Sequence, residues 1–304
     1  MTGVKGTLLK GKVAVVTGAG RGIGRGEALS LGAYGAAVVV NDLGGAVDGS
    51  GASRSPAEEV VAEIKKAGGT AVANYDSVAS WKGAENIVKA AMDSFGRIDI
   101  LVNNAGVLRD RMVFNMTEEE WDTVMKVHIY GTFFCTRHAS AIMRQQRFGR
   151  IISTSSQAGL GNMGQANYSA AKEAIVGFTR TAARDLGRYG VTVNAIRPRA
   201  ATRMTVNPEL IAAWERAGRK DLVQELQALN PEDIAPLITF LASDAADSIN
   251  GCTFLVYKGY VGIYPELAPS QALFKEGSWT VEDLVDVVPK TIAKNRQREL
   301  GPAF

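Results

Sequence analysis

The sequence predicts an α/β fold in which a parallel sheet carries helices on both of its faces. Seven short apolar runs, rich in β-branched residues, recur along the 304-residue chain and are typical of buried strands. Amphipathic stretches of helical length separate these runs, and the first run leads into a glycine-rich loop. Strict alternation of strand and helix indicates a doubly wound, Rossmann-like sheet. We therefore expect seven parallel strands and a C-terminal extension.

The alternation assigns a strand or a helix to most of the chain. The strands are expected at residues 12–17, 36–41, 70–74, 98–103, 150–154, 191–196 and 253–257. The helices are expected at residues 22–34, 56–67, 81–95, 118–145, 165–189 and 232–243. Ligands of such sheets bind beyond the carboxyl ends of the strands, so the residues that follow each strand are the first candidates for a site.

The same pattern divides the chain into a domain and a tail. Residues 1–258 hold all the predicted strands and form one expected domain, in which a helical stretch at about 200–230 is a candidate substrate lid. Residues 259–304 form an extension that we expect to pack on the domain or on a partner subunit. The extension contains a predicted helix that starts at Thr280, with Asp283 as its capping-box partner.

Composition and charge narrow the classes of function. Hydrophobic residues make up 46% of the chain and charged residues 21%, which is enough for a large core. The net charge is +3 and no basic run tracks a phosphate backbone, so we expect no nucleic-acid partner. No stretch reaches the ~18 apolar residues of a membrane span, and we expect no membrane segment or leader. Cys135 and Cys252 fit no metal-ligand spacing, which predicts a cytoplasmic protein without a metal site.

The glycine-rich loop is a candidate phosphate cradle. The first predicted strand runs into Gly18, Gly22 and Gly24, whose spacing is G-x-x-x-G-x-G, and a helix follows at once. Glycines let the backbone turn tightly and approach a pyrophosphate, and the helix N-terminus favours the negative charge. Arg21 and Ile23 lie between these glycines and are predicted to contact the cofactor with them. A purely structural turn is the alternative.

Asp42 predicts which dinucleotide binds. It closes the second predicted strand, 18 residues after Gly24, where an acidic residue can bind the ribose 2′-hydroxyl. A carboxylate there repels a 2′-phosphate, which favours NAD over NADP. Arg21 favours the opposite choice, because a guanidinium can neutralise that phosphate. We give Asp42 the greater weight and expect NAD; a solvated turn residue is the alternative for this position.

A tyrosine, a lysine and a serine form the predicted catalytic group. Tyr168 and Lys172 stand four residues apart in a helical pattern and therefore share one face of the helix. Ser155 lies thirteen residues before Tyr168 and directly follows a predicted strand, so the three side chains meet at the carboxyl edge of the sheet. Ser156 is the alternative serine, although the spacing to Tyr168 favours Ser155.

These residue types suit proton transfer to or from a secondary alcohol. A phenol with a pKa near 10 is a poor base, but an ammonium within about 5 Å favours the phenolate and lowers that pKa. We expect Tyr168 to act as acid and base, Lys172 to lower the tyrosine pKa and bind the nicotinamide ribose, and Ser155 to hold the substrate oxygen. The carbinol hydride would pass to the nicotinamide.

Together these motifs resemble those of the short-chain dehydrogenase/reductase family over residues 8–258. Asp76 follows the third predicted strand, and Asn104 and Gly106 follow the fourth, as in that family. The resemblance implies that Asp76 contacts the adenine, that Asn104 and Gly106 line the cofactor, and that Thr202 lies near the nicotinamide amide. It also places three neighbours of these residues in the cofactor site: Ser77, Val78 and Ala105.

Longer strings resemble one branch of this family, the (3R)-hydroxyacyl-CoA dehydrogenase domains of peroxisomal multifunctional enzymes of type 2. The strings lie at residues 41–45, 72–78, 108–111 and 164–172. This resemblance implies a 3-hydroxyacyl-CoA substrate and a homodimer or homotetramer built on the helices at 118–145 and 165–189. Residues 301–304 are not a peroxisomal address, so we expect a stand-alone enzyme.

Two positions depart from the pattern of the wider family. His128 stands where that family has an asparagine, and the branch described above also has histidine there. The resemblance implies a catalytic part for His128 in a proton relay; a buried structural histidine is the alternative. Arg199 replaces the glycine that follows Pro198 in the family, and it brings a charge that either meets CoA phosphates or faces water.

The sequence therefore supports one favoured function and two alternatives. The favoured function is NAD-dependent oxidation of an (R)-3-hydroxyacyl-CoA to the 3-oxoacyl-CoA in a β-oxidation-type pathway. The first alternative keeps the chemistry but applies it to a free steroid, an aryl alcohol or a polyketide ketone. The second is a catalytically silent nucleotide-binding scaffold, which leaves the complete set of tyrosine, lysine and serine without an explanation.

Overall fold

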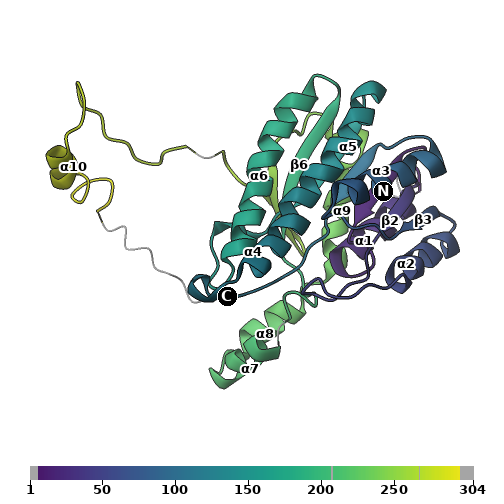
Figure 1. Ribbon diagram of the computed structural model, residues 1–304, viewed down its shortest axis with the longest axis horizontal. Helices are drawn as coiled ribbons and strands as arrows, with labels where there is room; N and C mark the ends of the chain where they lie inside the picture. The colour runs from purple at the N-terminus through teal and green to yellow at the C-terminus, as the bar shows by residue number, and fades with distance from the viewer. Residues whose placement is uncertain (1–5, 207, 267, 295–304) are drawn as a thin grey trace. The chain divides into compact units, whose positions relative to one another are not determined.

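The computed structural model describes residues 6–206, 208–266 and 268–294. The chain forms two compact units, Met1–Ile263 and Tyr264–Phe304, and the first of them holds the whole sheet (Figure 1). Among the helices in the described ranges, none is long and apolar enough to cross a membrane.

The sheet of the first unit has eight strands in the order β3-β2-β1-β4-β5-β6-β7-β8. Seven of them are parallel: β1 (Val13–Thr17), β2 (Ala37–Asn41), β3 (Thr70–Asn74), β4 (Ile100–Asn103), β5 (Gly149–Thr154), β6 (Val191–Pro198) and β7 (Thr253–Tyr257). Each lies where the sequence predicts a strand, which confirms the doubly wound α/β fold. The strand order reverses between β1 and β4, the point at which such sheets bind ligands.

The eighth strand is the part of the sheet that the sequence analysis did not predict. β8 (Tyr260–Ile263) pairs antiparallel with β7 at the edge of the sheet. Lys258 and Gly259 connect the two strands, and Lys258 adopts a φ of 46° to make the turn. Most of β8 is exposed, so it lacks the long buried apolar run by which the other strands are recognised.

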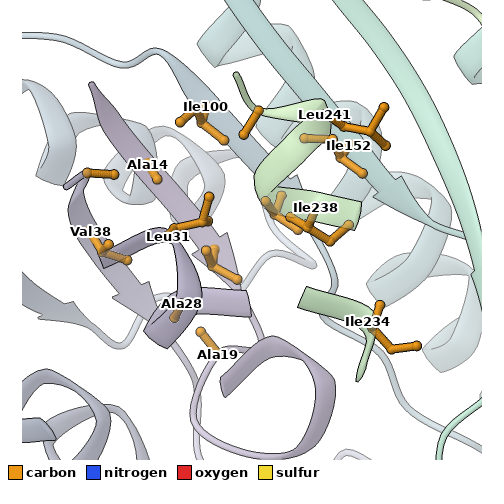
Figure 2. Packing of buried hydrophobic residues seen from close by; sticks show 14 of the residues in the cluster. Ala14, Ala19, Ala28, Leu31, Val38, Ile100, Ile152, Ile234, Ile238 and Leu241 are labelled. Atoms are coloured by element: carbon orange, nitrogen blue, oxygen red, sulfur yellow. The ribbon is translucent and has the colours of Figure 1, made fainter. Parts of the chain in front are cut away.

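Helices cover both faces of the sheet, as predicted. On one face pack α1 (Gly22–Ala33), α2 (Ser55–Lys66) and α9 (Ala235–Leu241). On the other face pack α3 (Trp81–Phe95), α5 (Gly131–Gln146) and α6 (Ala166–Gly187). Alternate residues of β1 enter the two cores, since Val16 belongs to the first and Val15 to the second. Figure 2 shows the first core, to which the sheet, α1 and α9 all contribute.

The long helix predicted at 118–145 is divided into three parts. α4 (Glu118–Met125) and α5 flank a π-helical turn, η2 (Lys126–Tyr130). A π-helical turn inserts an extra residue into a helix, and such insertions are frequent at functional sites. Here the turn carries His128. Hydrophobic periodicity does not reveal the insertion, because the apolar stripe continues on both sides of it.

Three further helices lie outside the alternating core. The segment predicted as a lid contains α7 (Pro208–Arg216) and α8 (Lys220–Gln227), which a turn at Gly218 with a φ of 73° separates. In the second unit, α10 (Val281–Val287) begins after Thr280. The Thr280 side chain accepts a hydrogen bond from the Asp283 amide, and the Asp283 carboxylate accepts one from the Thr280 amide. The predicted capping box is therefore confirmed.

Candidate active site

A cleft of about 280 Å³ opens at the carboxyl ends of the central strands, beside the reversal between β1 and β4. The strand order predicts a ligand at this place. The cleft brings together every residue that the sequence analysis predicted as catalytic or cofactor-binding. These residues are Gly18, Arg21, Gly22, Ile23, Gly24, Asp42, Asp76, Ser77, Val78, Asn104, Ala105, Gly106, His128, Ser155, Tyr168, Lys172 and Thr202.

Two glycines of the loop after β1 leave no room for a side chain. A Cβ atom on Gly24 would lie 2.3 Å from Asn104 Nδ2 and 2.4 Å from the Gly18 carbonyl oxygen. A Cβ atom on Gly18 would lie 2.7 Å from the Cα atom of Ala105. The Asn104 amide group donates hydrogen bonds to the carbonyl oxygens of Thr17 and Gly18, at 2.9 and 3.0 Å. Asn104 therefore fixes the shape of the loop as well as lining the cleft.

Helix α1 presents its N-terminus to the cleft. Gly22, Ile23 and Gly24 of its first turn line the cleft, and Arg21 at the N-cap makes no side-chain capping bond. Gly22 has a φ of 54°, a conformation that favours glycine. Backbone N–H groups of a first helical turn and the positive end of the helix dipole together attract an anion. This end of the cleft fits the diphosphate of a dinucleotide.

Asp42 lies at the rim of the cleft, directly after β2. Its carboxylate accepts hydrogen bonds from the amides of Gly20 and Gly44, at 2.7 and 2.6 Å. These bonds hold the carboxylate beside the glycine loop. Burial and the charge of Arg21 lower the pKa of Arg203 on the other wall, and the charge of Asp42 opposes them. Three charged side chains thus share this end of the cleft.

Three asparagines hold Asp76 at the end of β3. Asn74 and Asn86 donate hydrogen bonds to its carboxylate at 2.8 and 3.0 Å, and Asn41 donates one to its backbone carbonyl at 2.9 Å. The sequence analysis missed this network. Asn86 belongs to α3, and only the packing of that helix against the sheet brings its amide to Asp76.

Helix α6 places Tyr168 and Lys172 on one face, as their spacing predicts. Lys172 Nζ lies 5.4 Å from the centroid of the Tyr168 ring. The same ammonium group donates a 2.6 Å hydrogen bond to the carbonyl oxygen of Thr154, at the end of β5. Lys172 is 3% exposed, so the protein surrounds the charge that it would carry.

The two serines after β5 have different partners. Ser155 is buried, and its hydroxyl donates a 2.7 Å hydrogen bond to the backbone carbonyl of Lys172. The Ser156 hydroxyl accepts a 3.1 Å hydrogen bond from the Ala158 amide, and the same side chain lowers the pKa of Tyr168. Ser155 continues the ladder of β5 through its amide, which is bonded to the Ile196 carbonyl, and successive side chains of an extended chain point to opposite faces. The Ser155 hydroxyl is thus already bonded to α6, and Ser156 is the serine whose side chain influences Tyr168.

Burial controls the charges of the tyrosine and the lysine. Burial raises the pKa of Tyr168 to about 12, although the hydrogen bond with Ser156 acts in the opposite direction. Burial lowers the pKa of Lys172 to about 7. The direction for Tyr168 is opposite to the one predicted from Lys172, because neither charged form is solvated in the cleft. At neutral pH the Tyr168 hydroxyl is therefore protonated and can donate.

His128 packs against the ring of Tyr168. The two rings are perpendicular and their centroids lie 5.2 Å apart. His128 Nε2 lies 2.9 Å from the Val107 carbonyl oxygen, and the buried Nδ1 has no hydrogen-bond partner among the described residues. Burial, and then the charge of Lys172, hold the pKa of His128 well below its usual range. A Cβ atom on Gly106 would lie 2.6 Å from the imidazole, so this glycine makes room for the histidine.

The segment after β6 closes the other side of the cleft. Thr202 and Arg203 both line it, and the Arg203 guanidinium donates a 3.2 Å hydrogen bond to the Gly45 carbonyl oxygen. This bond links the segment to the loop after β2. The sequence analysis missed Arg203, although the residue directly follows Thr202. Arg199 lies outside the lining of the cleft and donates a 3.1 Å hydrogen bond to Glu225 of α8. The sequence analysis expected Arg199 to meet CoA phosphates or to face water, and it did not predict this partner.

Known proteins are similar to this chain in both sequence and fold. The profile of the family described as short chain dehydrogenase matches residues 12–210. Mouse peroxisomal multifunctional enzyme type 2 is 47% identical over 253 residues, which cover 83% of this chain and 32% of that protein. A hydroxyacyl-CoA dehydrogenase of Mycobacterium tuberculosis is 46% identical over 260 residues, which cover 83% of this chain and 78% of that one.

Two further comparisons extend over nearly the whole length of the other protein. The 3-oxoacyl-[acyl-carrier-protein] reductase of Synechocystis sp. is 44% identical over 260 residues, which cover 84% of this chain and 99% of that one. The crystal structure of a short chain dehydrogenase from Mycobacterium avium has a TM-score of 0.80 and 42% identity, covering 94% of this chain and 96% of that one. The chain thus spans about a third of the mouse enzyme but most of each bacterial relative. It belongs to the short-chain dehydrogenase family of NAD(P)-dependent oxidoreductases.

Proposed function

We propose that the protein interconverts (R)-3-hydroxyacyl-CoA and 3-oxoacyl-CoA with NAD, as part of a β-oxidation-type pathway. The observation that carries the proposal is the placement of Tyr168, Lys172 and Ser156 in the cleft that also contains the glycine loop. Hydride transfer between an alcohol and a dinucleotide requires an anion cradle, a proton carrier and a group that holds the reacting oxygen. In this proposal the glycine loop, Tyr168 and Ser156 supply these three functions.

Tyr168 carries the proton in this proposal. In reduction, its hydroxyl donates a proton to the ketone oxygen while Ser156 donates a hydrogen bond to the same oxygen. In oxidation, the phenolate accepts the alcohol proton. Before the substrate binds, the hydrogen bond with Ser156 lowers the pKa of Tyr168, and a charged Lys172 beside the ring also favours the phenolate. We also propose that Lys172 binds the nicotinamide ribose.

The cleft fits a nicotinamide dinucleotide, which supplies the hydride acceptor in oxidation and the hydride donor in reduction. The uncapped N-terminus of α1 suits its diphosphate, and Asp76 suits its adenine. Asp42 favours NAD because its carboxylate repels a 2′-phosphate. Arg21 and Arg203 lie at the same end of the cleft, and their positive charges act against this repulsion. We therefore propose a preference for NAD and not an absolute requirement for it.

His128 orients Tyr168 in this proposal and does not hold the transferred proton. Its pKa lies well below the usual range, so the imidazole is neutral at the pH at which the enzyme works. The edge-on contact between the two rings restricts the rotation of the phenol. This role replaces the direct part in a proton relay that the sequence analysis assigned to His128.

The names of the relatives support the acyl-CoA substrate class. One relative is named as a hydroxyacyl-CoA dehydrogenase, and the mouse relative is a multifunctional enzyme of the peroxisome. The reductase from Synechocystis provides a second candidate, because its name describes the substrate as a 3-oxoacyl group carried by a protein. Both candidates share a 3-oxoacyl thioester and differ in its carrier. The free steroid, aryl alcohol and polyketide ketone remain as the alternative class.

Exposed aromatic residues support a homodimer or a homotetramer. Trp121 lies on α4, Tyr130 in η2 and Phe133 on α5, and the exposed Trp81 of α3 lies 6.3 Å from Phe133, measured between ring centroids. Exposed apolar patches of this kind mark protein interfaces. We propose that α4 to α6 form the subunit contact. The cytoplasmic location, the lid at 200–230 and the packing of residues 259–304 stay predictions.

The substrate class is tested by steady-state kinetics on matched substrates. The purified protein is incubated with NAD and either (R)-3-hydroxybutyryl-CoA, the (S) enantiomer, the corresponding acyl-carrier-protein thioester or a free steroid alcohol. Formation of NADH is followed by absorbance. We expect the largest kcat/KM for the (R)-acyl-CoA. Larger values for the carrier-protein thioester or for the free alcohol would replace the acyl-CoA with that substrate, and the absence of any turnover would refute the proposed reaction.

A further inference from the structure

An ion pair between a buried arginine and a partly exposed glutamate lies beside the proposed catalytic group. Arg197 of β6 is 3% exposed, and its guanidinium makes two hydrogen bonds of 2.7 Å. Nη2 donates to the carboxylate of Glu173, and Nη1 donates to the backbone carbonyl of Ser156. Glu173 directly follows Lys172 in α6. The guanidinium therefore connects Ser156 to the helix that bears Tyr168 and Lys172.

This connection completes a series of bonds between the end of β5 and α6. Lys172 Nζ binds the carbonyl oxygen of Thr154, and the Ser155 hydroxyl binds the carbonyl oxygen of Lys172. Ser156, the next residue, is attached through Arg197 and Glu173. Three successive residues are thus tied to the same turn of α6. The distance between Ser156 and Tyr168 depends on the last of these ties.

Gly159 leaves space for the ion pair. A Cβ atom at this position would lie 2.9 Å from Glu173 Oε2 and 3.0 Å from Arg197 Nη1. Burying a guanidinium has a large desolvation cost, and well-packed apolar side chains of similar volume are often as stable or more so. Stability alone is therefore a weak reason for an arginine at this depth, and the bond from Arg197 to Ser156 gives a second reason.

We infer that Arg197 and Glu173 form a positioning clamp that holds Ser156 where it and Tyr168 can both reach the substrate oxygen. This inference rests on the roles proposed above for Ser156 and Tyr168. Neither Arg197 nor Glu173 lines the cleft, so the pair would act on the substrate through Ser156. The glycine loop and Asp42 lie at the other end of the cleft. Loss of the clamp therefore impairs the chemical step and leaves cofactor binding intact.

Two single variants test the clamp. Arg197→Met removes both hydrogen bonds but keeps an unbranched side chain of similar length. We expect kcat to fall by about 10- to 100-fold, because a small displacement of a positioned group has effects of this size. The dissociation constant for NAD, measured by calorimetry, should stay unchanged. Glu173→Gln is the matched control: it keeps an acceptor for Arg197 and should retain most of the wild-type kcat.

The double variant Arg197→Met/Glu173→Leu separates positioning from stability. It replaces the ion pair by an apolar contact and should recover much of the melting temperature, so it remains informative if the single variant folds poorly. A clamp predicts that kcat stays low in the double variant. It also predicts that, in oxidation, the rise of kcat/KM with pH moves to higher pH, because kcat/KM reports the free enzyme, in which a displaced Ser156 no longer lowers the pKa of Tyr168.

Wild-type turnover is the reference for these measurements, so the clamp can fail while the proposed reaction stands. Recovery of the wild-type kcat together with the melting temperature in the double variant would overturn the clamp. An unchanged kcat in a folded Arg197→Met variant would do the same. Low kcat in both variants with unchanged NAD affinity is the result that the clamp predicts.

Discussion

The hydroxyl of Ser155 donates a 2.7 Å hydrogen bond to the backbone carbonyl of Lys172. This bond ties the Ser155 side chain to α6. The neighbouring Ser156 is the serine whose side chain lowers the pKa of Tyr168. The two adjacent serines therefore have separate tasks, one in the packing of the strand against the helix and one in the proposed chemistry.

Alanine substitutions of the two serines should differ in their effect on kcat. Ser156→Ala removes a hydrogen bond to the reacting oxygen, so we expect kcat to fall by about 100-fold. It also removes the bond that the Ser156 side chain accepts from the Ala158 amide, so we expect the free energy of unfolding to fall by about 1 kcal/mol. Ser155→Ala removes a buried hydrogen bond, so we expect the free energy of unfolding to fall by about 1 kcal/mol with little change in kcat. Steady-state kinetics and urea unfolding measure the two effects. A larger loss of kcat in Ser155→Ala than in Ser156→Ala would contradict this assignment.

Gly24→Ala should abolish cofactor binding. Its Cβ atom would meet the Asn104 side chain at 2.3 Å and the Gly18 carbonyl at 2.4 Å, so the loop must move away from the shape that fits a diphosphate. The NAD dissociation constant, measured by calorimetry, should rise by at least about 100-fold, equal to ~2.7 kcal/mol. Gly177→Ala in α6 is the matched control, because an added Cβ atom there meets nothing within 4 Å. Equal effects of the two substitutions would refute the steric explanation.

Asp42→Asn should change the choice of cofactor. The substitution removes the negative charge that repels a 2′-phosphate, while the amide oxygen can still accept a hydrogen bond from Gly20 or Gly44. We expect the ratio of kcat/KM with NADP to that with NAD to rise by about tenfold or more, which corresponds to ~1.4 kcal/mol. Asp48→Asn, at a carboxylate bonded to Ser50 in the exposed loop, is the control. If the ratio stays constant in Asp42→Asn, Asp42 does not determine the preference.

Glu27 should make the stability depend on pH. It is fully buried in α1, and neither carboxylate oxygen has a hydrogen-bond partner among the described residues. Burial raises its pKa from 4.5 to about 8. Between these two pKa values the unfolded chain has lost the proton and the folded chain keeps it. The free energy of unfolding therefore falls by up to ~1.4 kcal/mol for each unit by which the pH rises. Below pH 4.5 and above pH 8 this contribution is constant.

Glu27→Gln isolates the contribution of this carboxyl group. The amide cannot release a proton, so the variant lacks this part of the fall in stability with pH. Urea unfolding at pH 5 and pH 8 should show that the variant gains stability relative to the wild-type protein as the pH rises. A difference between the two proteins that does not change with pH would show that Glu27 is ionised in the folded state or is solvated there.

Local features of the sequence predict most of the fold, but they do not predict β8 or the π-helical turn. The seven parallel strands can be predicted because each is a short apolar run rich in β-branched residues. β8 cannot, because its exposed side chains lack that pattern and its turn depends on Lys258 in an unusual conformation. The π-helical turn around His128 leaves the apolar stripe unbroken, so periodicity does not reveal it.

The site was predictable as a set of residues but not as a set of bonds. Motif spacing identified the glycine loop, Asp42, Tyr168 and Lys172, all of which line one cleft. Spacing also favoured Ser155, because it does not show which of two adjacent side chains of an extended segment faces the helix. Arg197 and Glu173 lie 24 residues apart, and only the packing of α6 against β6 brings them together.

The substitution Tyr168→Phe tests the central claim most directly. Phenylalanine keeps the ring against His128 and removes only the hydroxyl that carries the proton. With NAD and (R)-3-hydroxybutyryl-CoA, we predict a loss of kcat of at least about 100-fold and an unchanged dissociation constant for NAD. A variant that binds NAD as the wild-type protein does and turns over at the wild-type rate would contradict the proposed mechanism.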